Sequence, residues 1–295
     1  MSGLDIGKTK KLDVYTLLED YAGYDTTFYA QHGISFLIDA TSDKGVRNRI
    51  LMDVGQCSKP VLRNMELLGI DPKSIDIIVL SHCHYDHVGG LIGVLKSIGK
   101  EVPIVAHEDI FRPHLVVEPM LKHVGIGKDI IKESEENGGY WILTREPVKL
   151  MRGITTTGEI QEEEREPFER DTVKGLYTIG KKGLILDQLL DDISLAVSTP
   201  KGLVIISGCS HAGIVSIVKR SVKLAGDEKI RAVIGGFHLI SAKEDRIFKV
   251  IESLKSMKVR KIYTGHCTGF NAEYMLYREF GSDFIKLNCG KIIRF

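Results

Sequence analysis

Residues 82–87 combine three histidines and one aspartate: His82, His84, Asp86 and His87. Imidazole nitrogens and carboxylate oxygens are protein ligands for zinc, iron and manganese. If the segment continues a strand, His82 and His84 point the same way, because side chains alternate along a strand. A turn after them would direct Asp86 and His87 toward a second point nearby. The spacing therefore predicts two adjacent metal sites; the alternative is a polar loop whose histidines only form hydrogen bonds.

Three further histidines, His211, His238 and His266, each follow an apolar stretch and are bordered by glycine. Strand ends at one edge of a sheet converge, so all three imidazoles are expected to reach one site. Cys209 lies two residues before His211. It is either a thiolate ligand or a small buried residue before a tight turn.

The elements that would position these residues alternate between strands and helices, which is typical of the α/β class. The run of large apolar residues at 77–80 predicts a strand buried on both faces, and 91–98 predicts a helix. We expect the other strands at 12–18, 33–40, 50–53, 102–107, 176–179, 193–199, 203–207, 230–234 and 261–264. We expect the other helices at 60–68, 214–224, 245–257 and 273–280, with a strand or hairpin at 284–294.

Residues 111–170 differ in character from the rest, because charged runs alternate with aromatic residues. A long segment after a metal motif suggests an insertion that forms a pocket wall or lid. We interpret it as part of one domain, residues 1–295, rather than as a second domain. Trp141, the only tryptophan, is expected in the core.

Composition narrows the class of protein. With 43% hydrophobic and 27% charged residues and a net charge of +1, the chain resembles an ordinary globular protein. This charge gives no reason to expect a nucleic-acid or membrane partner. The five cysteines are scattered, residues 1–11 lack the apolar core of a signal peptide, and no apolar run approaches a membrane span. We therefore expect a cytoplasmic protein; its oligomeric state is not indicated.

The order His82-x-His84-x-Asp86-His87 resembles the signature of the metallo-β-lactamase superfamily. The likeness extends upstream to residues 51–55, where Asp53 ends an apolar run. The resemblance implies a four-layered αβ/βα sandwich: two mixed sheets flanked by helices, with the site at one edge. Asp53 would then be an outer carboxylate that orients a metal-binding histidine; the alternative is a cap at a strand end.

The resemblance also implies a ligand set for two divalent ions, most simply zinc, with iron or manganese as alternatives. One ion would be held by His82, His84 and His211, the other by Asp86, His87 and His266. His266 matches the last ligand of the superfamily. The histidine loop usual in the superfamily is replaced here by residues 155–159, so we infer that His211 substitutes for it.

Two residues, Asp86 and His238, are expected to take part in catalysis. Asp86 would also hold a water for attack. His238 is either an acid just behind the metal ligands or a group that binds an anionic part of the substrate, unless it only bonds a backbone carbonyl. A bound metal can lower the pKa of water to about 7 and neutralise a departing phosphate.

Residues 208–211, 235–239 and 265–269 are similar to a branch of the superfamily that includes archaeal dihydropterin synthase-like enzymes. These join a dihydropterin diphosphate to a phosphorylated ribofuranosylaminobenzene. We thus expect an enzyme, a transferase expelling diphosphate or a hydrolase, whose substrate is a phosphorylated small molecule. The alternatives are a general hydrolase of esters, lactones or phosphodiesters and a non-catalytic protein stabilised by metal; structural zinc sites, however, are usually closed by four protein ligands.

Overall fold

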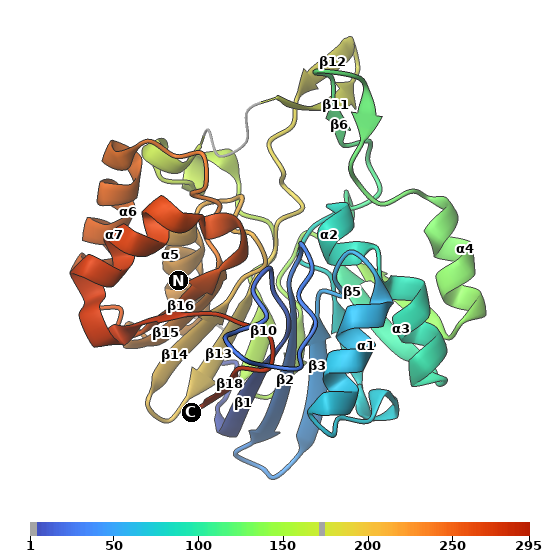
Figure 1. Ribbon diagram of the computed structural model, residues 1–295, viewed down its shortest axis with the longest axis horizontal. Coiled ribbons are helices and arrows are strands. Elements are labelled where there is room, and N and C mark those ends of the chain that lie inside the picture. Colours follow the sequence, from blue (N-terminus) through green and yellow to red (C-terminus); the bar gives the residue numbers. More distant parts are fainter. Residues whose placement is uncertain (1–4, 171–174) are drawn as a thin grey trace.

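The computed structural model describes residues 5–170 and 175–295, and its first sheet is built mainly from the N-terminal half (Figure 1). Its strands are β1 (Thr9–Leu18), β2 (Ser35–Ser42), β3 (Arg47–Met52), β4 (Ile77–Val79), β5 (Val102–Ala106), β8 (Gly139–Leu143) and β18 (Ile292–Arg294). They lie in the order β18-β1-β2-β3-β4-β5-β8. The neighbours from β3 to β8 pair in parallel and the others antiparallel, so the sheet is mixed.

The second sheet has the same plan and comes mainly from the C-terminal half. Its strands are β9 (Lys149–Met151), β10 (Ile154–Thr156), β13 (Leu195–Thr199), β14 (Gly202–Ile206), β15 (Ile230–Gly236), β16 (Ile262–Gly265) and β17 (Phe284–Lys286). They lie in the order β17-β16-β15-β14-β13-β10-β9. The neighbours from β14 to β17 pair in parallel. In each sheet, the parallel strands therefore end at a common edge.

Helices cover the outer face of each sheet, which gives four layers. Helices α1 (Ser58–Leu67) and α3 (Leu91–Ile98) pack on the first sheet, whereas α5 (Ile214–Ala225), α6 (Glu244–Ser256) and α7 (Phe270–Phe280) pack on the second. A third apolar cluster, with Phe36 and Ile206 among its members, fills the space between the sheets. The expected αβ/βα sandwich is confirmed. Within the described residues, no helix has the length and apolar character needed to cross a membrane.

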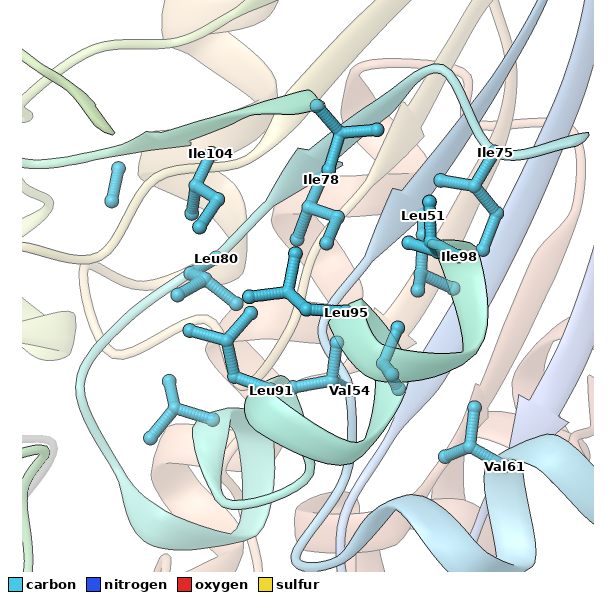
Figure 2. Close-up of a cluster of buried hydrophobic side chains, with 14 of the residues drawn as sticks. Leu51, Val54, Val61, Ile75, Ile78, Leu80, Leu91, Leu95, Ile98 and Ile104 are labelled. Atoms are coloured by element: carbon cyan, nitrogen blue, oxygen red, sulfur yellow. The ribbon is translucent and has the colours of Figure 1, made fainter. Parts of the chain in front are cut away.

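Figure 2 shows why α3 forms where it does. Leu91, Leu95 and Ile98 recur at helical spacing, so one face of the helix is apolar. That face packs against Ile78 and Ile104 of the first sheet, and all five side chains are buried. The packing fixes the metal motif, because the motif joins β4 directly to this helix.

The expected insertion at 111–170 has different boundaries in the structure. Its residues 139–143 form β8 of the first sheet, and residues 149–156 supply β9 and β10 of the second. The aromatic and apolar residues at 139–143 thus belong to a strand of the first sheet and not to an insertion. Trp141 is partly buried against the core, edge-on to Phe111 at 4.9 Å between ring centroids.

What projects from the sandwich is a separate four-stranded sheet, here called the arm (Figure 1). Its strands are β6 (Leu115–Val116), β7 (Lys122–His123), β11 (Leu176–Gly180) and β12 (Gly183–Leu186). Two segments far apart in the chain thus build the arm. The helix α4 (Asp129–Glu136) follows β7 and leads back to the first sheet.

The segment 284–294 is neither one strand nor a hairpin. Its first part, β17, pairs with β16, and its last part, β18, pairs with β1 in the other sheet. Between them, the backbone N–H groups of Cys289 and Gly290 donate to the carbonyls of Tyr21 and Thr16. These hydrogen bonds fix the connection by which the chain passes from the second sheet to the first.

Candidate metal centre

The histidines singled out in the sequence lie at one edge of the sandwich, on loops that follow parallel strands of both sheets. His82 and His84 follow β4, and the short helix α2 (Tyr85–Val88) carries Asp86 and His87. From the second sheet, His211 follows β14, and His266 opens a single helical turn directly after β16. The apolar strands end here, so polar side chains from both sheets meet at this edge.

The first group comprises His82, His84 and His211. Nε2 of His82 lies 3.1 Å from Nδ1 of His84 and 3.2 Å from Nε2 of His211. Burial lowers the pKa of His84 to about 4 and holds the pKa values of His82 and His211 well below the usual value. All three rings are thus neutral at pH 7, which is the form that binds metal ions.

The second group comprises Asp86, His87 and His266. Oδ2 of Asp86 lies 3.3 Å from Nε2 of His266 and 3.5 Å from Nε2 of His87. Burial would raise the pKa of Asp86, but the neighbouring His87 and His266 outweigh burial and keep that pKa below its usual value. The group therefore offers one charged oxygen and two ring nitrogens.

Cys209 lies between the two groups. Its Sγ is 3.1 Å from Nε2 of His87, and it is within 4.8 Å of the ligand atoms of His82 and His211 on one side and of His87 and His266 on the other. The thiol is buried, and burial raises its pKa. The position of Cys209 favours a ligand shared by both groups over the alternative of a small packing residue.

The donor atoms fit a pair of bound cations. In the described part of the chain, Nε2 of His266 is buried and has no hydrogen-bond partner, although it faces Asp86. Buried polar atoms normally have a partner, so such an atom needs an explanation. Nitrogen, oxygen and sulfur donors of this kind suit zinc and related divalent ions.

Carboxylates behind the ligands fix their rings. Oδ2 of Asp53 lies 2.7 Å from Nδ1 of His87, and Asp53 also accepts hydrogen bonds from the backbone N–H and hydroxyl of Ser81. Asp53 therefore has the position predicted for a carboxylate that orients His87, and metal binding by His87 stays a prediction. On the opposite side, Oδ1 of Asp20 lies 2.9 Å from Nδ1 of His266. Such partners hold a ligating imidazole in one orientation and tautomer.

The segment 155–159 contributes no imidazole to the centre. Instead, the buried carboxylate of Glu159 lies 2.8 Å from Nε2 of His107. His107 is thus paired with Glu159, while His211 lies beside His82. His238 lies next to His211, with 4.3 Å between ring centroids, and its Nδ1 is buried without a hydrogen-bond partner in the described residues. A catalytic role for His238 stays a prediction.

The structure adds residues that the sequence interpretation missed. The ring of His32 lies against that of His266, tilted by 39° with 5.0 Å between ring centroids, and its Nδ1 lies 3.1 Å from Oδ2 of Asp20. His32 directly precedes Gly33, but no apolar stretch leads into it, so it carried only part of the signal of the other histidines.

A second missed pair lies at the base of the arm. His114 is buried, its Nδ1 is 2.7 Å from Oδ2 of Asp187, and its ring faces His84 at 6.1 Å. Arg112 bonds the same Asp187. These residues come from chain segments far apart, and no local pattern connects them.

Comparison with known proteins agrees with this geometry. The model of the metallo-beta-lactamase superfamily matches residues 23–266. This chain belongs to that superfamily. It is therefore an enzyme of a group whose members typically bind metal ions.

Individual relatives extend along the whole chain. A protein of Methanocaldococcus jannaschii named 7,8-dihydropterin-6-methyl-4-(beta-D-ribofuranosyl)-aminobenzene-5′-phosphate synthase is 51% identical over 293 residues, 99% of each chain. An uncharacterized protein of the same organism is 33% identical and covers 94% of this chain and 98% of its own length. The solved structure of Tm1679, described as a metal-dependent hydrolase of the beta-lactamase superfamily, aligns with a TM-score of 0.78 at 24% identity, over 96% of this chain and 98% of that one. This last likeness supports the fold alone.

Replacing Asp53 tests the second group. The change Asp53→Asn keeps the shape but weakens the acceptor that orients His87, so metal affinity should fall about 10- to 100-fold. Competition with a coloured chelator measures that affinity. The exposed Asp25→Asn serves as the control, because its carboxylate has no partner at the site and its affinity should be unchanged. Equal affinities for both variants would contradict the orienting role.

Proposed function

We propose that this enzyme forms 7,8-dihydropterin-6-methyl-4-(β-D-ribofuranosyl)-aminobenzene 5′-phosphate at a centre of two divalent cations, most simply zinc. The observation that carries the proposal is the pair of adjoining ligand groups that meet at Cys209. The full-length 51% identity to the synthase of Methanocaldococcus jannaschii supports the choice of reaction. Both substrates would be phosphorylated small molecules.

The reaction replaces a carbon–oxygen bond by a carbon–nitrogen bond. The amine nitrogen of the ribofuranosylaminobenzene phosphate attacks the methylene carbon at position 6 of the dihydropterin. The bond from that carbon to the diphosphate breaks, diphosphate leaves with the bonding pair, and the amine loses one proton. Bound divalent cations would supply positive charge for the departing diphosphate oxygens.

The chain itself would hold and orient the reactants. His82, His84 and His211 would hold one cation, and Asp86, His87 and His266 the other, with Cys209 between them. Asp86 would accept a hydrogen bond from the attacking group and so align it. The neutral state of the first three rings supports this assignment, since their lone pairs stay available at neutral pH.

A cavity of about 470 Å³ beside His266 has the features expected for a pterin ring. Tyr21 and Phe270 line it and are 43% and 83% exposed. Nζ of Lys286 lies over the Tyr21 ring, 5.6 Å from its centroid, so Phe270 is the better candidate for stacking. Glu273 and Glu19 line the cavity as well. Nζ of Lys286 lies 2.6 Å from Oε2 of Glu273, so these two side chains form an ion pair at the cavity. A pterin presents N–H donors along one edge, which a carboxylate accepts in pairs.

The product assay tests the reaction. Metal-loaded wild-type protein, given the dihydropterin diphosphate and the phosphorylated arylamine, should release the coupled product and diphosphate, both detected by mass spectrometry. His84→Ala should lower the rate on the order of a hundredfold or more, because one cation loses a ligand. Its circular dichroism spectrum should stay that of a folded protein. Hydrolysis of the dihydropterin diphosphate without coupling would contradict the synthase proposal in favour of a hydrolase.

Removing the exposed ring of Phe270 tests the cavity. Phe270→Ala should raise the KM for the dihydropterin substrate by about tenfold, since base-type stacking on an aromatic side chain contributes roughly 1–3 kcal/mol. The KM for the arylamine and the melting temperature should change little. Phe248→Ala, which removes a ring 53% exposed on α6, is the matched control. A similar KM in both variants would exclude the cavity beside His266 as the pterin site.

A further inference from the structure

A second cavity, of about 510 Å³, lies in the C-terminal half and is lined mainly by basic side chains. The six basic residues at this cavity are Lys201, Lys229, Arg231, Lys255, Lys258 and Arg260. Two acidic residues, Glu279 and Asp283, face them. The whole chain carries a net charge of only +1. The lining thus has a clear excess of basic over acidic residues, although the chain as a whole is almost neutral.

The basic cavity is separate from the metal centre, although the same strands connect the two. Lys201 and Arg231 lie where β14 and β15 begin, and Arg260 lies just before β16. The residues of the metal centre follow the opposite ends of these strands. An inference about this cavity therefore does not depend on the proposed function.

Most of these cations have no ion-pair partner among the residues that the structure describes. Lys255 pairs with Glu279 at 2.8 Å. In residues 5–170 and 175–295, the other five basic side chains make no ion pair or side-chain hydrogen bond, and Nε of Arg231 is buried without a partner. Elsewhere the chain pairs its arginines closely, as Arg47 and Arg49 do with Asp39. Lysine and arginine side chains that are free of ion pairs around a cavity can bind an anionic ligand.

Lys258 occupies a backbone position that normally takes glycine. Its φ is 56°, in the left-handed region that disfavours residues with a Cβ. Lys258 lies two residues after the last residue of α6. The equivalent position after α1 has the same left-handed backbone, and there the residue is Gly69, with φ 67°. A lysine that is strained relative to glycine thus lines the cavity. Strain of this kind concentrates at functional positions.

The shape and lining indicate the class of ligand. We propose that the basic cavity binds a small anion with two or more phosphate groups. Its volume lies within the range of small-molecule pockets, about 300–1,000 Å³, and several cations surround one hollow rather than forming a stripe along a face. Ile230, Val259 and Phe280 supply an apolar wall for any carbon skeleton attached to the phosphates. A nucleic acid would instead need an extended basic surface.

Inorganic triphosphate is the probe, and isothermal titration of the metal-loaded wild-type protein is the measurement. We expect a binding event that persists in His84→Ala, because that variant damages only the metal centre. Arg231→Gln and Lys258→Gly should each weaken this event at least about tenfold. Lys258→Gly should also melt at the same or a higher temperature, so lost binding there does not come from misfolding.

Lys44→Gly is the charge-matched control, because Lys44 lies in an exposed turn and does not line the cavity. Its triphosphate affinity should equal that of the wild type. The proposal fails if no binding survives in His84→Ala, or if Lys44→Gly weakens binding as much as Lys258→Gly. It also fails if a single-stranded oligonucleotide binds the wild type more tightly than triphosphate and loses that affinity in Arg231→Gln, since the cavity would then serve a nucleic acid.

Discussion

Nε2 of His82 faces two other ring nitrogens at once, at 3.1 Å in His84 and 3.2 Å in His211. An imidazole nitrogen offers either one hydrogen or one lone pair in the ring plane, so hydrogen bonding can satisfy only one of these contacts. The surroundings also disfavour a charged ring, because burial lowers the pKa of all three histidines. A cation bound by all three ring nitrogens would satisfy every one of them. The need to satisfy these nitrogens is the constraint on which the rest of the site depends.

Holding such a cluster together requires both halves of the fold. The first sheet supplies His82 and His84 through β4, whose position is fixed by the packing of α3. The second sheet supplies His211 through β14. At Gly208, just before the loop that carries His211, a Cβ atom would collide with the hydroxyl of Ser81. The two sheets therefore approach so closely at this edge that only glycine fits, and this approach brings their histidines within contact of each other.

The sequence predicted the parts of the site that local order determines. The spacing of His82, His84, Asp86 and His87 is set within the short loop after β4 and the single turn of α2. The glycine-bordered His211 and His266 follow strands that end at the same edge. The α/β class followed from strand–helix alternation, and the sandwich followed from the family resemblance. Pairings across the chain were not predictable in this way. Asp20 meets His266, and His114 meets Asp187, only because strands distant in sequence become neighbours in space. The predicted boundaries of the insertion at 111–170 were wrong for the same reason. Residues 139–143 are flanked by charged runs in the sequence, and only their pairing with β5 shows that they are a strand of the first sheet.

Elemental analysis of the purified protein, with His211→Ala beside the wild type, tests the central claim most directly. The account predicts about two divalent metal ions per wild-type chain and about one in the variant, because each ligand group holds one ion. The variant should remain folded, since the hydrophobic clusters that position both sheets do not include His211. A metal content that is the same in both proteins would contradict the assignment of His211. Less than one ion per wild-type chain would contradict the binuclear centre itself.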